Sequence, residues 1–172
     1  VGYLNLRTYV ATADAELRDA FAGFRAQGID YFIVDLRYNG GGLVSTAETL
    51  SDLLGGDRAA SDAQLRITHN ANKSHLNEVR YFAALPQSVR PVRIAFLTTV
   101  GTASASEINV NSMAPWVEVA IVGADTYGKP VGQLAFDLGG CEDRLRLVSF
   151  RGENALGRGD YYDGLAETLE FA

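Results

Sequence analysis

The sequence predicts an α/β fold, in which short apolar strands alternate with helices. Residues 31–36 and 92–98 are short apolar runs rich in strand-forming residues, and each is followed by small residues and then by a helical pattern. Residues 117–122 form a third run of the same kind. Because loops at strand ends build the functional sites of α/β proteins, we expect sites in the loops that follow these three runs.

The helices are predicted from capping residues and from the spacing of apolar side chains. Asp14 can cap a first helix, in which Leu17, Phe21 and Phe24 recur at spacings of four and three before Gly28 can end it. The other helices are expected from the Ser-x-x-Glu capping box of Ser45 and Glu48 to about 55–56, and over residues 104–113. The weaker strand predictions are residues 1–10, 64–68, 132–138, 144–150 and 168–171, with 77–85 as a strand or a helix.

The composition excludes several classes of protein. A chain of 172 residues with 47% hydrophobic and 21% charged residues suits one soluble globular domain. The net charge of −6 disfavours nucleic acid and an anionic membrane surface as partners. The single Cys141 and two histidines give neither an internal disulfide nor a Cys/His set at zinc-ligand spacing, so no structural metal is expected. No apolar run reaches the ~18 residues that span a bilayer.

Ser104 is the candidate nucleophile. It lies in the run Gly101-Thr-Ala-Ser-Ala-Ser-Glu107, whose small residues let a substrate approach the backbone, and it opens a predicted helix. The free N–H groups and the positive end of that helix can stabilise an oxyanion on an attacked carbonyl, with the Ala105 amide as the natural donor. The alternative is structural, because Ser104 and Glu107 also form a capping box, and a serine at a helix start is usually a cap.

A serine hydroxyl needs a general base to attack a carbonyl at neutral pH. His69 and His75 both lie in a polar stretch, without the apolar neighbours that would hold an imidazole in place. Lys129 is the better candidate, since it stands alone in an uncharged turn just after a predicted buried strand. Burial can lower the pKa of a lysine by several units from its reference value of about 10.4. An exposed turn lysine is the alternative.

Two further features fit a serine and lysine pair. Gln133 could position the lysine amine through its side-chain amide, although alone it would be a surface residue of a strand. The run Asn39-Gly-Gly-Gly42 could turn the backbone N–H of Gly41 or Gly42 toward a bound carbonyl, as a second oxyanion donor. A plain glycine-rich turn is the alternative, and phosphate binding is not expected because no Gly-Lys-Ser/Thr follows.

Together these segments resemble the carboxyl-terminal processing, or tail-specific, protease family of serine peptidases. The similar segments are Ile33–Gly42, like the family's strand and oxyanion loop, Gly101–Ile108, like its nucleophile segment, and Thr126–Gln133, like its lysine segment. Ser104 and Lys129 are twenty-five residues apart, as that family's pattern requires. The resemblance covers residues 1–137, and residues 138–172, with Cys141, resemble nothing that we can assign.

The resemblance implies a role for each site residue: Ser104 as nucleophile, Lys129 as base, Gln133 as the partner of the lysine, and the amides of Ala105 and of Gly41 or Gly42 as oxyanion hole. It also implies a crotonase-like or caseinolytic-protease-like spiral core of strand, loop and helix units in one domain. Protein or peptide substrates would be cleaved near their carboxyl termini, outside the bacterial cytoplasm, and no cofactor is implied.

Two features depart from the family pattern. The PDZ domain common in the family is absent from this chain, and Pro130 follows the lysine where glycine is usual. Proline fixes its own φ and lacks an N–H, so the turn that carries Lys129 is expected to be set differently. Because the chain opens in an apparent strand without an initiator Met or a signal-peptide pattern, we expect a piece of a longer protein.

The rival interpretation is a catalytically silent module that binds a peptide or a hydrophobic ligand. The retinoid-binding repeats of the photoreceptor matrix resemble the same family without working as peptidases. The joint presence of Ser104, Lys129 and Gln133 favours the enzyme, because a binding pocket has no need of all three. An inactive scaffold or inhibitor-like domain is a third possibility.

Overall fold

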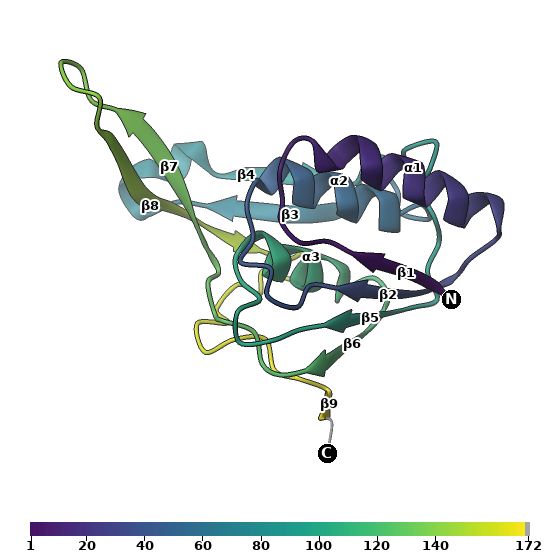
Figure 1. Cartoon of the computed structure of the whole chain (residues 1–172). Coiled ribbons are helices and arrows are strands. Elements are labelled where there is room, and N and C mark those ends of the chain that lie inside the picture. The colour runs from purple at the N-terminus through teal and green to yellow at the C-terminus, as the bar shows by residue number, and fades with distance from the viewer. Residues whose placement is uncertain (171–172) are drawn as a thin grey trace.

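The computed structural model, which describes residues 1–170, contains one parallel and one antiparallel sheet (Figure 1). All neighbouring strands of the first sheet run parallel. Its spatial order is β1 (Gly2–Asn5), β2 (Tyr31–Asp35), β5 (Arg93–Leu97), β6 (Glu118–Gly123) and β9 (Leu169–Glu170). The α/β class predicted from the sequence is confirmed.

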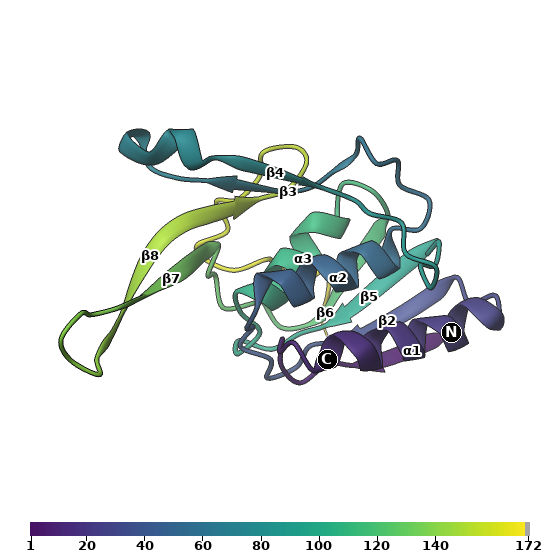
Figure 2. The same cartoon turned by 90° about the horizontal axis from the view of Figure 1, so that it is seen from above.

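Three helices lie over one face of the parallel sheet (Figures 1 and 2). They are α1 (Ala13–Ala26), α2 (Val44–Leu54) and α3 (Ala105–Met113), and a 3-10 helix, η1 (Ala71–Leu76), lies outside this layer. Helix α1 contributes Leu17 and Phe21 to the core, and the Phe21 ring stacks on Phe32 of β2 with 6.0 Å between ring centroids. The 3.6-residue period of α1 therefore matches its packing, as predicted.

The second sheet is antiparallel where its strands pair, in the order β4 (Glu78–Tyr81), β3 (Ala63–Thr68), β8 (Arg144–Glu153) and β7 (Val131–Asp137). Strands β3 and β8 pack on α3, and β3 also contacts α2, so these two helices lie between the two sheets. The far halves of β7 and β8 extend from the body as a two-stranded hairpin (Figures 1 and 2). We call these two strands and their turn, residues 131–153, the hairpin.

The core lies between the parallel sheet and its helices. Alternate strand residues point into it, which is the period of two expected of a strand with one covered face. The most buried of these, each 0–2% exposed, are Phe32, Val34, Ile94 and Phe96 from the central strands β2 and β5. These strands end at the same edge of the sheet, so the loops that follow them emerge together.

Several boundaries differ from the sequence predictions. The strand expected over residues 1–10 is shorter, at Gly2–Asn5, and the first helix begins at Ala13 after Thr12, so Asp14 lies in the first turn and is not the cap. Residues 77–85 contain strand β4, not a helix. The last predicted strand, 168–171, is confirmed at Leu169–Glu170, and its residue 171 lies outside the described residues.

The predicted capping box of Ser45 and Glu48 is wrong. Helix α2 begins at Val44, with Leu43 at its N-cap and no capping side chain. The Leu43 N–H donates to Tyr9 O at 2.8 Å, and this bond fixes the chain directly before the helix. Tertiary hydrogen bonding therefore starts the helix earlier than the local capping signal indicates.

Candidate active site

Three loops meet at the carboxyl edge of the parallel sheet: residues 36–43 after β2, 98–104 after β5 and 124–130 after β6. We call them the loop cluster. The first two are joined because Ala103 N–H and the Ser106 hydroxyl both donate to Asn39 O, at 3.1 and 2.9 Å. The second and third are joined because Tyr127 N–H donates to Thr102 O at 2.9 Å. Ligands of open α/β sheets bind at this edge.

Ser104 has an unusual backbone conformation. Its φ is 59° and its ψ −115°, in a region that residues with a Cβ seldom adopt and that costs about 1–3 kcal/mol. Gly41 lies against it, since a Cβ added at Gly41 would come within 2.8 Å of Ala103 O and of Ala105 N. The close approach of these two loops therefore requires glycine at this position.

The buried carboxylate of Glu107, which is 0% exposed, holds the nucleophile loop and the lysine loop together. Its Oε2 accepts from Ser104 N–H at 2.7 Å and from Lys129 N–H at 2.9 Å. Its Oε1 accepts from the Thr126 hydroxyl at 2.6 Å and from Gly128 N–H at 2.7 Å. Four donors and the N-terminal end of α3 stabilise the carboxylate, which in turn fixes the backbone of Ser104 and Lys129.

A cleft of about 480 Å³ opens beside Ser104. Lys129 and Gln133 line the same cleft, so the structure brings these three predicted side chains to one cavity. Ser104 and Lys129 are half-buried, whereas Gln133 is exposed at the base of the hairpin. Within the described residues, no hydrogen bond joins the side chains of Ser104 and Lys129 to each other.

The two predicted oxyanion donors of the glycine loop differ. The Gly41 N–H already donates to Asn39 Oδ1 at 2.9 Å. The N–H groups of Gly42 and Ala105 have no hydrogen-bond partner among the described residues, and Gly42 lines the cleft. Gly42 therefore combines an unpaired N–H with a place in the cleft, whereas Ala105 is 0% exposed and does not line it.

The lysine turn contains the unusual proline. Pro130 is buried, and its carbonyl accepts from Gly152 N–H of β8 at 2.8 Å. A Cβ at Gly128, whose φ is 88°, would lie 2.3 Å from Tyr162 O. The turn is therefore held on both sides of Lys129. The contacts that hold it do not involve an N–H at position 130, so the lack of this group in Pro130 does not remove any of them.

The histidines occupy other surfaces. His75 is exposed in η1, and His69 is half-buried with its ring centroid 6.2 Å from that of Phe150. His69 lines a second cleft of about 320 Å³, which contains neither Ser104 nor Lys129. His69 therefore has an aromatic neighbour from another strand, which its polar flanking sequence did not indicate, and neither histidine lines the cleft beside Ser104.

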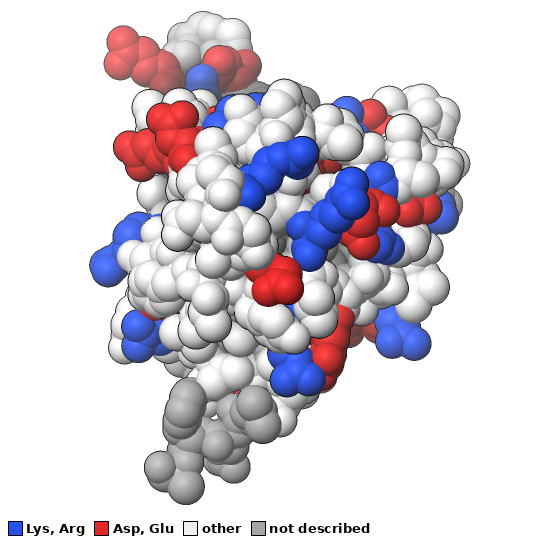
Figure 3. Space-filling model, turned by 90° about the vertical axis from the view of Figure 1, so that its right-hand side faces the viewer, with Lys and Arg blue, Asp and Glu red and all other residues white. Residues whose placement is uncertain are grey.

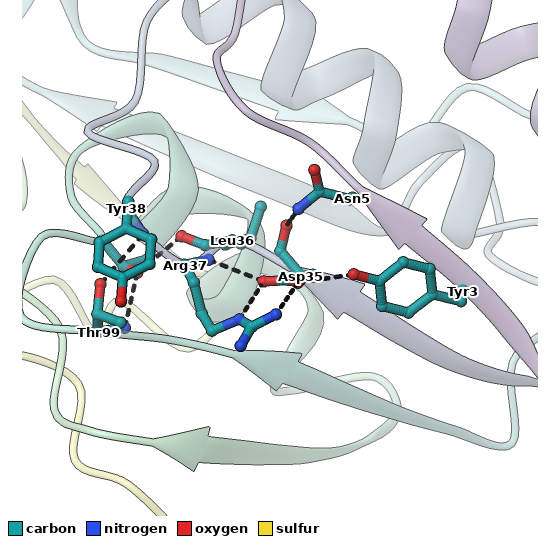
Figure 4. A network of polar contacts seen from close by, with 8 residues as sticks. Tyr3, Asn5, Asp35, Leu36, Arg37, Tyr38 and Thr99 are labelled. Atoms are coloured by element: carbon teal, nitrogen blue, oxygen red, sulfur yellow. Dashed lines mark hydrogen bonds and ion pairs between the residues drawn. The ribbon is translucent and has the colours of Figure 1, made fainter.

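An ion pair anchors the start of the first loop (Figure 4). Asp35, 2% exposed, accepts from Arg37 Nε at 2.9 Å and Nη2 at 2.7 Å, and from the Tyr3 hydroxyl at 2.7 Å. The Arg37 hydrogen bonds, aided by that of Tyr3, lower the pKa of Asp35 to about 2 despite its burial. Tyr38 follows with a φ of 63°, and its N–H donates to Thr99 Oγ1 at 3.1 Å.

The sequence interpretation missed the roles of Glu107 and of this ion pair. The sequence indicates Glu107 only as half of a capping box, and that box is present in the structure. Three of the four groups that donate hydrogen bonds to Glu107, however, lie outside the box, in Thr126, Gly128 and Lys129. A signal was available, because Glu107 stands among small and apolar residues where a lone acid is unusual.

The structure offers no sign of a metal centre in the part of the chain that it describes, where no three acidic, histidine or cysteine side chains form a possible ligand set. Cys141 is exposed on the turn of the hairpin. None of the described helices is both long and apolar enough to cross a membrane.

The sequence matches the family model of peptidase family S41 over residues 1–159. It is 30% identical over 138 residues to the carboxyl-terminal-processing protease of a Picosynechococcus strain, a match that covers 80% of this chain and 31% of that protein. It is 30% identical over 135 residues to the carboxy-terminal processing protease CtpA of Bacillus subtilis, covering 78% of this chain and 27% of the relative. The chain thus spans about 30% of the length of these relatives.

Solved structures extend the likeness along the chain. A crystal structure of an S41-type protease from Bacteroides fragilis superposes with a TM-score of 0.89 at 26% identity, over 98% of this chain and 46% of that one. The photosystem II D1 C-terminal processing protease shares the fold, with a TM-score of 0.76 at 23% identity over 98% of this chain and 42% of the other. The resemblance expected over residues 1–137 was therefore too short, because β8 belongs to the shared fold. The chain belongs to peptidase family S41, the family of these carboxyl-terminal-processing proteases.

Proposed function

We propose that this chain is the catalytic core of a serine endopeptidase that cleaves protein or peptide substrates near their carboxyl termini. The observation that supports the proposal most directly is the shared cleft of Ser104, Lys129 and Gln133. In this proposal Ser104 Oγ attacks the scissile carbonyl carbon while the neutral Lys129 amine accepts the hydroxyl proton. The amides of Ala105 and of Gly42 or Gly41 stabilise the oxyanion that forms.

The second half of the reaction uses the same groups. The Lys129 ammonium returns its proton to the leaving amine as the peptide C–N bond breaks, which leaves an acyl group on Ser104. Water then attacks the ester carbonyl while Lys129 accepts a proton from it. Lys129 returns this proton to Ser104 Oγ as the ester C–O bond breaks, which releases the acid product and restores both groups. Gln133, exposed at the base of the hairpin, positions the amine through its side-chain amide.

Membership of peptidase family S41 supports this reaction. The cellular location of the activity is part of the same proposal. Activity outside the bacterial cytoplasm is what the family resemblance implies. A relative that is 31% identical over 144 residues, from Tetradesmus obliquus, is a chloroplastic C-terminal processing peptidase. The rival proposal, a silent binding module of the same fold, predicts peptide binding without turnover.

Substitution of the two reacting side chains tests the proposal. Ser104→Ala and Lys129→Ala should each lower cleavage of an unstructured fluorogenic peptide at least ~1000-fold with an unchanged circular dichroism spectrum. His69→Ala and His75→Ala are the controls and should keep nearly full activity. Loss of activity in a histidine variant, or full activity in Lys129→Ala, would contradict the lysine base.

A further inference from the structure

The cleft beside Ser104 has a charge pattern opposite to that of the chain. The chain carries a net charge of −6, yet the side chains that line this cleft include Lys129 and Arg146 and no aspartate or glutamate. At the end of the molecule opposite the hairpin, acidic and basic side chains are interspersed (Figure 3). A cleft lined by one sign of charge concentrates ligands of the opposite sign.

Arg146 is the charge in this cleft that the proposed reaction does not use. It pairs across the hairpin with Ala135, and Gln133 lies two residues along the same strand as Ala135, so all three side chains share one face of the ribbon. Gln133 and Arg146 both line the cleft. The hairpin therefore presents a guanidinium on the face that carries the proposed partner of Lys129.

The acid nearest to Arg146 on that face is already engaged. Asp137 pairs across the ribbon with Arg144, which donates to it through Nε at 2.5 Å and Nη2 at 3.1 Å. Arg146 itself makes no ion pair or side-chain hydrogen bond within the described part of the chain. Its donors thus remain available for a ligand, and a guanidinium binds a carboxylate through two parallel hydrogen bonds.

Apolar side chains form part of the remaining cleft lining. Val10, Leu43, Val44 and Phe150 line it, and Val10 and Leu43 are 40% and 47% exposed, so apolar surface faces the cavity. The Phe150 ring lies over Gly132, where an added Cβ would come within 1.9 Å of it. The cleft therefore suits an extended peptide that has apolar side chains and one carboxylate.

We propose that Arg146 is a specificity-determining residue, which binds a carboxylate of the substrate in the cleft beside Ser104. This inference rests on the proposed function, because it names the substrate class of the same site. The carboxylate belongs to an acidic side chain near the scissile bond or to the free carboxyl terminus of the substrate. These two sources share one chemistry, and peptides that carry each separately distinguish them.

Peptide binding to the Ser104→Ala chain measures this interaction without turnover. Three fluorescent peptides of one apolar sequence are compared: one with a glutamate and an amidated end, one with glutamine and a free carboxyl terminus, and one with glutamine and an amidated end. At least one carboxylate peptide should bind about five-fold more tightly than the neutral peptide at low salt. This ratio should fall toward one at ~0.5 M salt.

Arginine variants assign that preference to one side chain. Arg146→Met should bring the ratio of carboxylate to neutral affinity to about one, and Arg146→Glu should favour a lysine-bearing peptide instead. The matched control is the double variant Asp137→Asn/Arg144→Met, which removes a neighbouring pair that does not line the cleft and leaves no free acid beside Arg146, so it should keep the ratio. Circular dichroism establishes that each variant is folded.

Two results would overturn the inference: equal binding of all three peptides, including failure to bind any of them, or an equal loss of preference in the double variant and the Arg146→Met variant. The proposed function fails differently, through absence of cleavage by the unsubstituted chain. A chain that binds carboxylate peptides through Arg146 but cleaves none would retain this inference and contradict the peptidase.

Discussion

The loop cluster and the hairpin contribute to the same cleft but are held in opposite ways. Ser104 and the Lys129 backbone are fixed by hydrogen bonds to the buried carboxylate of Glu107, within a part of the chain that packs on the core. Gln133 and Arg146 stand on a ribbon that projects from the body and is mostly exposed (Figures 1 and 2). The backbone of the proposed nucleophile and base is therefore held by buried hydrogen bonds, whereas Gln133 and Arg146 stand on the less supported element.

This difference follows from the number of contacts that each region can bury. A two-stranded ribbon is marginally stable alone in water, and the hairpin gains packing mainly where β8 meets α3 and β3. The loop cluster instead combines buried hydrogen bonds from three loops. Changes in the cluster should therefore lower both stability and activity, whereas comparable changes in the exposed, projecting part of the hairpin should leave stability nearly unchanged.

The largest effect is expected from Glu107→Gln. A glutamine side chain would place an NH2 group against backbone N–H and hydroxyl donors, so at least one of the four hydrogen bonds would be replaced by a clash of donors. We expect the free energy of unfolding to fall by about 2–4 kcal/mol. We also expect kcat/KM on a peptide to fall about 100-fold, because the backbone of Ser104 and Lys129 loses its shared support. Urea unfolding and peptide cleavage measure the two effects.

Glu153→Gln is the matched control for this substitution. Glu153 is also buried, at 8% exposed, but its carboxylate accepts from Thr68 and Arg151, neither of which belongs to the loop cluster. The Glu153→Gln variant should have a lower free energy of unfolding, while its folded molecules should keep their peptide-cleavage activity. Equal losses of activity per folded molecule in both variants would show that Glu107 acts only through stability.

The sequence predicted much of this site, because its signals are local. The glycine run, the serine at a helix start and the lone turn lysine each follow a predicted strand, and the topology of a parallel sheet brings such loops to one edge. The partners of Glu107 were not predictable in this way, because Thr126, Gly128 and Lys129 reach it only after the chain has folded. These contacts depend on how the loops pack against one another, and no periodic pattern in the sequence indicates them.

The two capping boxes predicted from the sequence had different outcomes. The box at Ser104 is present in the structure, whereas the equivalent pattern at Ser45 is not used. The difference lies outside the two motifs, since a hydrogen bond from the Leu43 N–H to Tyr9 O fixes the chain two residues before Ser45 in the second case. Local capping chemistry therefore predicts a helix start only where tertiary bonds leave the boundary free.

A smaller effect is expected from Asp35→Asn, at the start of the first loop. The pKa of Asp35 is lowered from its ordinary value of 3.8 to about 2, first by the Arg37 side chain. Its ionised form therefore stabilises the folded chain fully above pH ~4, and this contribution is lost as the pH falls from ~4 to ~2. We expect the substitution to cost about 1 kcal/mol at pH 7, since Arg37 is half-exposed and solvent screens the pair. The difference between the two proteins should narrow at pH 3 in urea unfolding, and a constant difference would contradict this assignment.

The smallest effect is expected from Asp137→Asn, which alters the same kind of aspartate and arginine pair on the hairpin. The side chains of Asp137 and Arg144 are 75% and 55% exposed, so water already solvates both charges and salt screens them. We expect the free energy of unfolding to change by less than about 0.5 kcal/mol. Urea unfolding under the conditions used for Asp35→Asn measures this directly. A cost equal to that of Asp35→Asn would mean that the hairpin is as firmly supported as the loop cluster, and the contrast between the two regions would then be wrong.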